Sequence, residues 1–204
     1  MPWQKRNKKK IIIGVTGSFG SGKTTVAKML SLGRARLVDA DRISHKVLQP
    51  RTPAYKKIVR IFGRDILKLD QSIDRRKLAS IVFSDKKLLK KLNALVHPAA
   101  ITRIKQEIRD AREGIIILDA PLLVEAGLKN IVDKLVVVKI TRPEQLRRLI
   151  KKTQLSRKEI LKRIHAQMSL SDKLRMADFV IDNSGTLGKT KKQVTVIRRK
   201  LWKN

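Results

Sequence analysis

The segment 17–24 restricts the fold more than any other part of the sequence. It has the sequence Gly-Ser-Phe-Gly-Ser-Gly-Lys-Thr, which matches the eight-position pattern G-x-x-x-x-G-K-[ST]. The apolar run Ile11–Val15 precedes it, and a helical pattern opens behind it at Thr25. Such a loop wraps backbone N–H groups around a phosphate, and the helix N-terminus adds the positive end of its dipole. A chance glycine-rich turn with a lysine is the alternative, but strand, loop and helix occur here in the order that a nucleotide-binding loop requires.

The residue types in this loop also predict separate tasks. Lys23 is placed to reach the terminal phosphates of a nucleotide, and the Thr24 hydroxyl is a candidate ligand for Mg²⁺. ATP or GTP is the implied ligand. The acceptor of any phosphoryl group stays open at this point, because motor ATPases, GTPases and small-molecule kinases share the loop.

Short apolar runs alternate with amphipathic segments along the chain. The runs are Ile11–Val15, Arg36–Val38, Ile115–Leu118, Leu135–Ile140 and Phe179–Ile181. Strands that are apolar throughout and separated by helical patterns are typical of a parallel sheet covered on both faces. We therefore expect an α/β fold with a central parallel sheet flanked by helices, and a working site at the carboxyl ends of the strands.

The length of 204 residues suits one domain with insertions, 1–204. We expect a core of residues 11–52, 113–141 and 176–204, a helical lobe over the site at 53–112 and a lid at 142–175. Helical spacing of apolar residues supports the lobe at 76–83 and 88–95. The basic tail predicts a last helix through Val194, Ile197 and Leu201.

Acidic residues follow two of the predicted strands. Asp39 and Asp41 end the second run, and we expect Asp41 to face the acceptor and accept a hydroxyl proton, although it would also suit a helix cap. Asp119 closes the third run, where it would position magnesium or simply form a turn before Pro121. Glu125 would support an acceptor pocket or be solvated.

The predicted lid is strongly cationic. Between residues 142 and 175, eleven Lys and Arg stand against three acidic residues. A lid over phosphates has this character, because arginine holds phosphoryl oxygens and closure excludes water. A solvated surface charge is the alternative for each residue, so spacing alone selects none of them.

Composition excludes several function classes. With no cysteine, the chain has no disulfide, thiolate metal site or cysteine nucleophile, and its three histidines (His45, His97, His165) are too far apart in sequence to indicate a metal cluster. No window has the roughly 18 apolar residues of a membrane span, and the run behind the basic N-terminus lacks a cleavage signal. We expect a cytoplasmic protein with no membrane partner.

Several motifs together resemble the dephospho-CoA kinase family, and the resemblance covers residues 11–188. The motifs are Thr16-Gly17 with the loop, Leu32-Gly33, Val38–Asp41, Leu95–Pro98, Asp119–Glu125, Ala177-Asp178 and Ile181–Gly185. The resemblance implies transfer of the ATP γ-phosphoryl group to the ribose 3′-hydroxyl of dephospho-CoA, which gives CoA and ADP. It also implies that the lobe at 53–112 binds the acceptor.

The resemblance implies a role for individual residues. Asp41 would be the general base and Arg148 a lid arginine that acts with Lys23 on the transferred group. The acceptor side would include Thr16, the His97-Pro98 segment and Pro121-Leu122-Leu123, although a histidine before proline would also suit a turn. The nucleotide side would include Gly17, Gly20, Ser21, Gly22, Lys23, Thr24, Thr25 and, near the adenine, Asn183. Thr24 and Asp119 would hold Mg²⁺.

The chain departs from the family pattern in three ways. Lys152 stands where the family usually has a second lid arginine, and a lysine offers a point charge in place of a planar fork. Gln71-Ser72 replaces an Asp-Gly type of turn after Asp70. The formal net charge of +32 also exceeds what such an enzyme needs.

Two other function classes stay open. Another small P-loop kinase would keep the loop and lid but act on a nucleoside or nucleoside monophosphate. A nucleic-acid-binding ATPase is suggested by the charge, but the two Trp, one Tyr and four Phe are few for base stacking. We expect non-specific nucleic-acid binding at most, and a monomer or small homo-oligomer.

Overall fold

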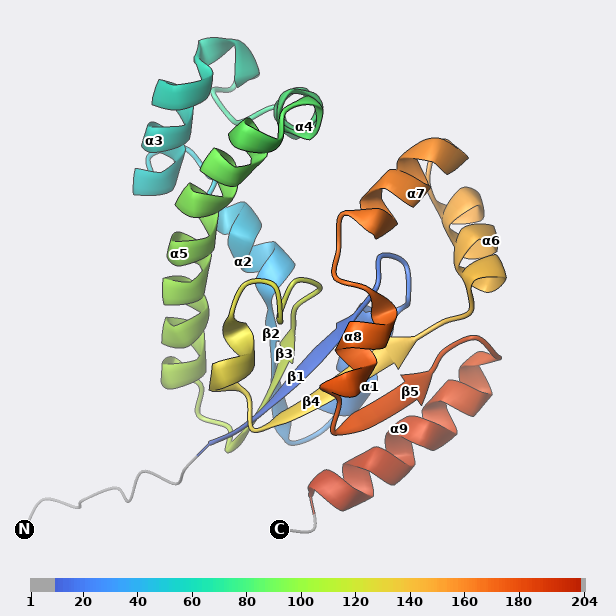
Figure 1. Cartoon of the computed structure of the whole chain (residues 1–204). Helices are drawn as coiled ribbons and strands as arrows, with labels where there is room; N and C mark the ends of the chain where they lie inside the picture. Colours follow the sequence, from blue (N-terminus) through green and yellow to red (C-terminus); the bar gives the residue numbers. More distant parts are fainter. Residues whose placement is uncertain (1–9, 203–204) are drawn as a thin grey trace, which may run out of the picture. The chain divides into compact units, whose positions relative to one another are not determined.

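The computed structural model describes residues 10–202, with the Phe83 side chain excepted, and most of the N-terminal basic run lies outside this range. The chain divides into two compact units (Figure 1). We call residues 10–39 and 111–202 the sheet unit, and Ala40–Asp110 the helical unit. The helical unit contains most of the lobe expected at 53–112 and, in addition, residues 40–52. The lid expected at 142–175 falls within the sheet unit.

The sheet unit is built on a parallel sheet of five strands within the described residues. The strands are β1 (Ile11–Gly17), β2 (Ala35–Asp39), β3 (Ile115–Asp119), β4 (Lys134–Lys139) and β5 (Phe179–Asp182), in the order β2-β3-β1-β4-β5. The five predicted runs and the α/β fold class are confirmed, with strand ends that differ by two residues at most. Because the strands are parallel, their carboxyl ends meet at one edge. Asp39 and Asp119 are register partners there.

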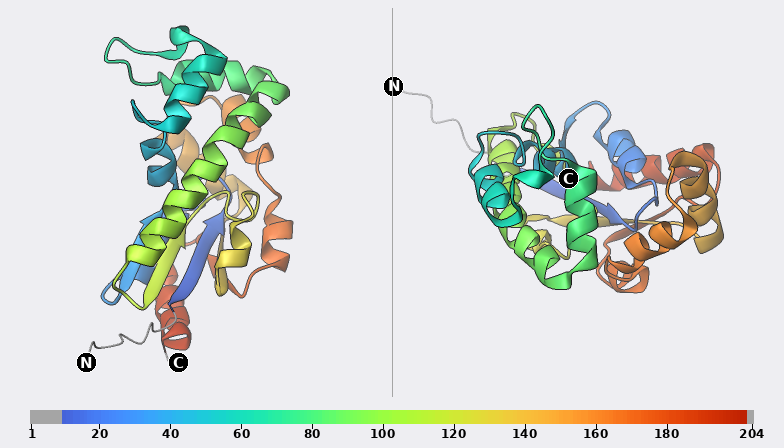
Figure 2. Two further views of the ribbon diagram at one scale, coloured as in Figure 1. Left: turned by 90° about the vertical axis from the view of Figure 1, so that its left-hand side faces the viewer. Right: turned by 90° about the horizontal axis from the view of Figure 1, so that it is seen from above.

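Helices cover both faces of this sheet. The helices of this unit are α1 (Lys23–Ser31), α6 (Arg142–Lys152), α7 (Arg157–His165), α8 (Leu170–Arg175) and α9 (Leu187–Leu201), and a 3₁₀ turn, η2, spans Leu128–Ile131. Of these, α1, α8 and α9 lie on the faces of the sheet, whereas α6 and α7 lie beyond the carboxyl ends of the strands. Figures 1 and 2 show α1 and α9 side by side on one face and α8 across the other. The core between the sheet, α1 and α9 includes Val26, Leu30, Val194, Ile197 and Leu201. The predicted last helix is thereby confirmed, since its three apolar residues are all buried.

The helical unit has its own core. It consists of α2 (Ala40–Lys46), α3 (Pro53–Phe62), η1 (Arg64–Ile66), α4 (Arg75–Ser84) and α5 (Lys86–Asp110). Ile58, Ile66, Ile73, Leu78 and Val82 form its buried centre. The apolar periodicity at 76–83 and 88–95 is confirmed as helix. No helix within residues 10–202 combines the length and hydropathy needed to cross a bilayer.

Two local alternatives from the sequence prove wrong. Asp41 does not precede a helix as its cap, because α2 already begins at Ala40 and Asp41 lies in the first turn. His97 does not order a turn, because α5 continues through it and through Pro98. The departure at Gln71 does form a turn: Gln71 adopts a left-handed φ of 62°, and both the N–H and the hydroxyl of Ser72 donate to Asp70 Oδ1.

Candidate functional site

The phosphate loop joins the carboxyl end of β1 to the N-terminus of α1. Gly20 and Gly22 have φ angles of 77° and 85°, and the Ser21 N–H donates to the Ser18 carbonyl oxygen over 3.0 Å. Gly22 is the N-cap residue of α1 and has no side chain to accept the helix's first N–H groups. The loop therefore directs the positive end of α1 at whatever occupies it.

The neighbours of this loop leave no space for larger residues. A Cβ on Gly17 would lie 2.5 Å from both Ser21 Oγ and the Val138 carbonyl oxygen, and one on Gly22 would overlap Asn183 Nδ2. The Ser21 hydroxyl is buried and has no hydrogen-bond partner among the described residues. A buried donor without a partner costs free energy unless a ligand pairs with it. A close-packed glycine cradle with an unsatisfied hydroxyl fits a phosphate group.

Asn183 supports the loop from the end of β5. Its Nδ2 donates to the Ser21 carbonyl oxygen over 2.8 Å, and its Oδ1 accepts from Thr190 Oγ1 of α9 over 2.8 Å. The side chain is buried, so it packs against the loop from the interior of the protein. The family resemblance implies that Asn183 lies near the adenine, and a contact with the base stays a prediction.

Lys23 and Asp119 face each other beside the loop. Lys23 Nζ lies 3.7 Å from Asp119 Oδ1, and the Asp119 side chain is 3% exposed. Asp119 is the last residue of β3, so it belongs to the sheet's carboxyl edge and not to the turn that follows. A buried carboxylate next to the loop lysine suits a magnesium-nucleotide. Among the described residues, no group of three or more His, Cys, Asp or Glu side chains could hold a metal by itself.

The chain after Asp119 bonds back to the start of the loop. Thr16 Oγ1 donates to the Pro121 carbonyl oxygen over 3.1 Å. Leu123 is fully buried below Gly14, whereas Leu122 is 36% exposed. Of the predicted acceptor residues in the sheet unit, Thr16 and Pro121 are therefore joined directly. Leu123 packs in the interior, and Leu122 offers an apolar surface to solvent.

Two glutamines hold the tip of the loop, and neither was predicted from the sequence. Gln145 of α6 donates from Nε2 to Ser18 Oγ (3.1 Å) and to the Phe19 carbonyl oxygen (2.5 Å). Gln167, between α7 and α8, accepts the Phe19 N–H at Oε1 over 2.8 Å. The guanidinium of Arg163 lies 5.7 Å from the Phe19 ring centroid. One signal was available: Gln145 stands at i, i+4 to Leu149 on the buried face of α6.

Arg148, the predicted lid arginine, is fixed in two directions. Its Nε donates to Glu144 Oε1 over 2.6 Å, and one terminal nitrogen donates to the Gly185 carbonyl oxygen over 3.1 Å. Hydrogen bonds from Arg147 and Arg148 lower the pKa of Glu144 from its usual 4.5 to about 2. Lys152 is exposed at the end of α6. Contact of either cation with a phosphoryl group stays a prediction.

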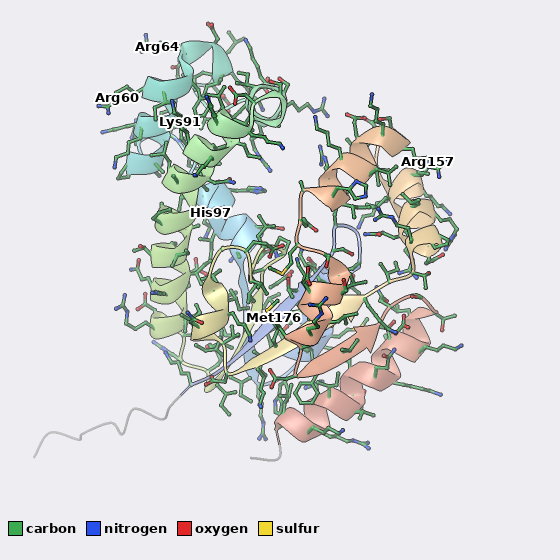
Figure 3. The ribbon with its side chains drawn as sticks, in the orientation of Figure 1. Arg60, Arg64, Lys91, His97, Arg157 and Met176 are labelled. Atoms are coloured by element: carbon green, nitrogen blue, oxygen red, sulfur yellow. The ribbon has the colours of Figure 1, made fainter. Side chains whose placement is uncertain are left out.

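The remaining predicted residues belong to the helical unit. Asp41 is exposed in the first turn of α2, which follows β2 directly. His97 is half-buried on α5, where burial lowers its pKa, so the imidazole is neutral at pH 7 (Figure 3). Thr24 and Thr25 lie in the first turn of α1, and Thr25 is exposed.

A parallel sheet with a phosphate loop after β1, and three helices between β4 and β5 of which α6 and α7 contact this loop, defines a P-loop kinase. A sequence model of the dephospho-CoA kinase family, CoaE, matches residues 11–189. This chain belongs to that family.

Individual relatives agree with this assignment. The dephospho-CoA kinase of Carboxydothermus hydrogenoformans is 43% identical, with 95% of this chain and 96% of the relative covered. The crystal structure of TT1252 from Thermus thermophilus is 31% identical, has a TM-score of 0.84 and covers 97% of this chain and all of that one. A dephospho-CoA kinase from Campylobacter jejuni is 27% identical at a TM-score of 0.68, with 93% and 96% covered.

Proposed function

We propose that this chain transfers the γ-phosphoryl group of ATP to the ribose 3′-hydroxyl of dephospho-CoA, giving CoA and ADP in the last step of coenzyme A biosynthesis. One observation carries the proposal. The phosphate loop, with its buried Ser21 hydroxyl and its Lys23–Asp119 pair, lies in a chain that the dephospho-CoA kinase family matches over residues 11–189. The loop supplies a site for ATP, and family membership identifies the acceptor.

On the nucleotide side, the chain's own groups bind and neutralise the phosphates. Backbone N–H groups from Gly20 to Thr25 surround them, and Lys23 balances charge at the terminal phosphate. Magnesium bound with the nucleotide would be held by the Thr24 hydroxyl and, directly or through water, by Asp119. It would supply further neutralisation of the phosphoryl oxygens. Few protein ligands are needed, because Mg²⁺ keeps several waters and takes phosphate oxygens as ligands.

On the acceptor side, Asp41 is the general base. It follows the carboxyl end of β2, whose Asp39 is the register partner of Asp119. A ribose hydroxyl has a pKa far above 7, so its attack on the γ-phosphorus requires a base that accepts the proton. The 3′-oxygen forms the new bond to phosphorus, the bond to the β-phosphate oxygen breaks, and ADP leaves. Arg148 and the lid cations hold the transferred oxygens.

The test measures ADP release with magnesium-ATP and a panel of acceptors: dephospho-CoA, adenosine, AMP, CMP and a 5′-hydroxyl oligonucleotide. Turnover with dephospho-CoA alone is the expected result. Asp41→Asn should lower kcat by about 10²–10⁴-fold, the usual contribution of a general base, with little change in the KM for ATP. Asp65→Asn is the matched control, since Asp65 is an exposed carboxylate elsewhere in the helical unit.

Other outcomes separate the alternatives. Turnover with adenosine or a nucleoside monophosphate would replace the acceptor assignment with that of another small P-loop kinase. An Asp41→Asn enzyme with an unchanged kcat would remove Asp41 as the base but leave the acceptor intact. As part of the proposal we retain a cytoplasmic location and a monomer or small homo-oligomer.

A further inference from the structure

Lys173 of α8 is a buried cation that the phosphate loop does not use. Its side chain is fully buried, which is rare for lysine because a charged group loses its hydration when it leaves water. A buried charge persists only where partners replace that hydration. The identity of these partners shows what the lysine holds in place.

Both partners belong to the segment that follows β3. Lys173 Nζ donates to the Pro121 carbonyl oxygen over 2.9 Å and lies 2.9 Å from Glu125 Oε1. Glu125 Oε1 also accepts the Met168 N–H over 3.0 Å, which joins the turn before α8 to the same carboxylate. The Pro121 carbonyl oxygen in turn accepts the Thr16 hydroxyl. One ammonium group therefore fixes both ends of residues 121–125.

This segment needs such support, because it is a series of turns that pairs with no strand within residues 10–202. Its backbone bonds are local, from the Ala126 N–H to the Leu122 carbonyl oxygen and from the Leu128 N–H to the Leu123 carbonyl oxygen. Leu123 anchors it in the core, and Leu122 beside it is exposed. The ammonium and carboxylate supply directional contacts that a sequence of turns lacks.

The segment also lies at the reacting edge of the sheet. It begins two residues after Asp119, whose carboxylate faces the loop lysine, and its Pro121 carbonyl oxygen is bonded to Thr16, which directly precedes the loop. A displacement of residues 121–125 therefore changes the surface next to the phosphates without touching the loop itself.

We propose that Lys173 and Glu125 are positioning residues that hold residues 121–125 as the wall against which the acceptor binds. This inference rests on the proposed function for the identity of the acceptor. Neither side chain takes part in proton or phosphoryl transfer. They act by fixing the Pro121 carbonyl group and the exposed Leu122 beside the phosphate loop.

The first test measures whether the pair holds the segment, and it needs no substrate. Amide hydrogen exchange of a peptide covering residues 120–128 is compared in the wild type, Lys173→Met and Glu125→Gln. Both variants should exchange faster at Leu123, Ala126 and Leu128, by about tenfold or more, while β1 and β4 keep their protection. Lys192→Met on the exposed face of α9 is the control and should match the wild type.

Glu125→Gln is the variant of the two that is expected to keep the fold. Its amide oxygen still accepts from Lys173 and from the Met168 N–H, so it weakens the network without leaving a buried ammonium unpaired. Lys173→Met removes the charge in a side chain of similar length. If Lys173→Met does not fold, Glu125→Gln carries the comparison.

The second test compares the KM values for the two substrates. The KM for dephospho-CoA should rise by about tenfold or more in the folded variants, whereas the KM and the binding of ATP should change by less than about twofold. A general loss of structure would instead weaken the binding of both substrates and lower the unfolding temperature of the whole sheet unit.

The two tests fail separately. Unchanged exchange of residues 120–128 overturns the positioning role, whatever the wild type phosphorylates. Faster exchange together with equal changes in both KM values also overturns it, because the wall then does not serve the acceptor. A wild type that ignores dephospho-CoA contradicts the proposed function, and the exchange experiment still decides whether Lys173 holds the segment.

Discussion

Single residues in the phosphate loop show how local chemistry and tertiary contact act together. Gly22 must adopt a φ of 85°, and its missing side chain leaves room for Asn183 Nδ2. The first requirement is local and is visible in the motif. The second depends on a residue at the far end of the chain, which only the folded sheet brings to the loop.

Gly22→Ala is therefore expected to weaken ATP binding by at least tenfold. A Cβ in the left-handed region costs about 1–2 kcal/mol, overlap with Asn183 adds to this cost, and about 1.4 kcal/mol corresponds to tenfold in affinity. Isothermal titration with ATP measures the change. Gly114→Ala is the control, because its Cβ would have no atom of the described residues within 4 Å. ATP affinity within twofold of the wild type would contradict the account of the loop.

Residues of the same type also take different roles that sequence alone does not separate. Lys173 is one of eleven cations between residues 142 and 175, yet it is fully buried and paired, whereas Lys152 is exposed. Composition and spacing give the same expectation for both. The difference arises because α8 turns Lys173 toward the carboxylate of Glu125.

At the scale of elements, α6 connects the lid region to the phosphate loop. Its first turn contains Glu144, which binds two arginines, and Gln145, which is buried against Ser18 and Phe19. The two neighbouring side chains point in different directions, because consecutive residues of an α-helix lie about 100° apart around its axis. Glu144 pairs with Arg147 and Arg148, and Gln145 holds the phosphate loop.

Gln145→Leu is expected to raise the KM for ATP and to destabilise the sheet unit by about 1–3 kcal/mol, because buried acceptors at Ser18 and Phe19 lose their donor. Thermal unfolding and steady-state kinetics give the two values. Gln154→Leu, at an exposed position beyond the end of α6, serves as the control. A KM for ATP equal to that of the wild type would show that the loop keeps its shape without this contact.

Glu144 gives α6 a pH-dependent contribution to stability. Its pKa in the folded protein, about 2, lies below the usual 4.5, so the ionised form favours folding. The contribution is complete above pH 4.5 and declines as the pH falls from 4.5 towards 2. The measurement is the free energy of unfolding of Glu144→Gln and of the wild type at several pH values from 7 downward. The stability difference should narrow below pH 4.5, and a difference that widens there would contradict this cause.

At the scale of the whole molecule, the excess of positive charge is the property that the proposed reaction does not explain. The formal net charge is +32, and cations occur on both units, as with Arg60, Arg64 and Lys91 on the helical unit and Arg157 on the sheet unit (Figure 3). Few aromatic residues accompany them. This pattern favours attraction to any polyanion over recognition of a particular sequence.

Polynucleotide binding is therefore expected at low salt, with equal affinity for different sequences. If about six to ten phosphates are contacted, the affinity should fall about 10³–10⁵-fold between roughly 50 and 200 mM salt. Fluorescence anisotropy with two oligonucleotides of unrelated sequence measures both properties. A sequence preference that survives at the higher salt would instead support specific nucleic-acid recognition.

The sequence by itself determined the sheet, the phosphate loop and the family. Buried strands are apolar along their whole length, and a phosphate loop needs glycine, lysine and threonine at fixed spacing. Both can therefore be recognised from a short stretch of sequence. Only the tertiary structure decided which polar residues support the loop and its neighbouring segment: Asn183, Gln145, Gln167 and Lys173. In these four hydrogen bonds the two residues are between 52 and 162 positions apart in sequence, and contacts over such separations follow from how strands and helices pack, which no local pattern specifies.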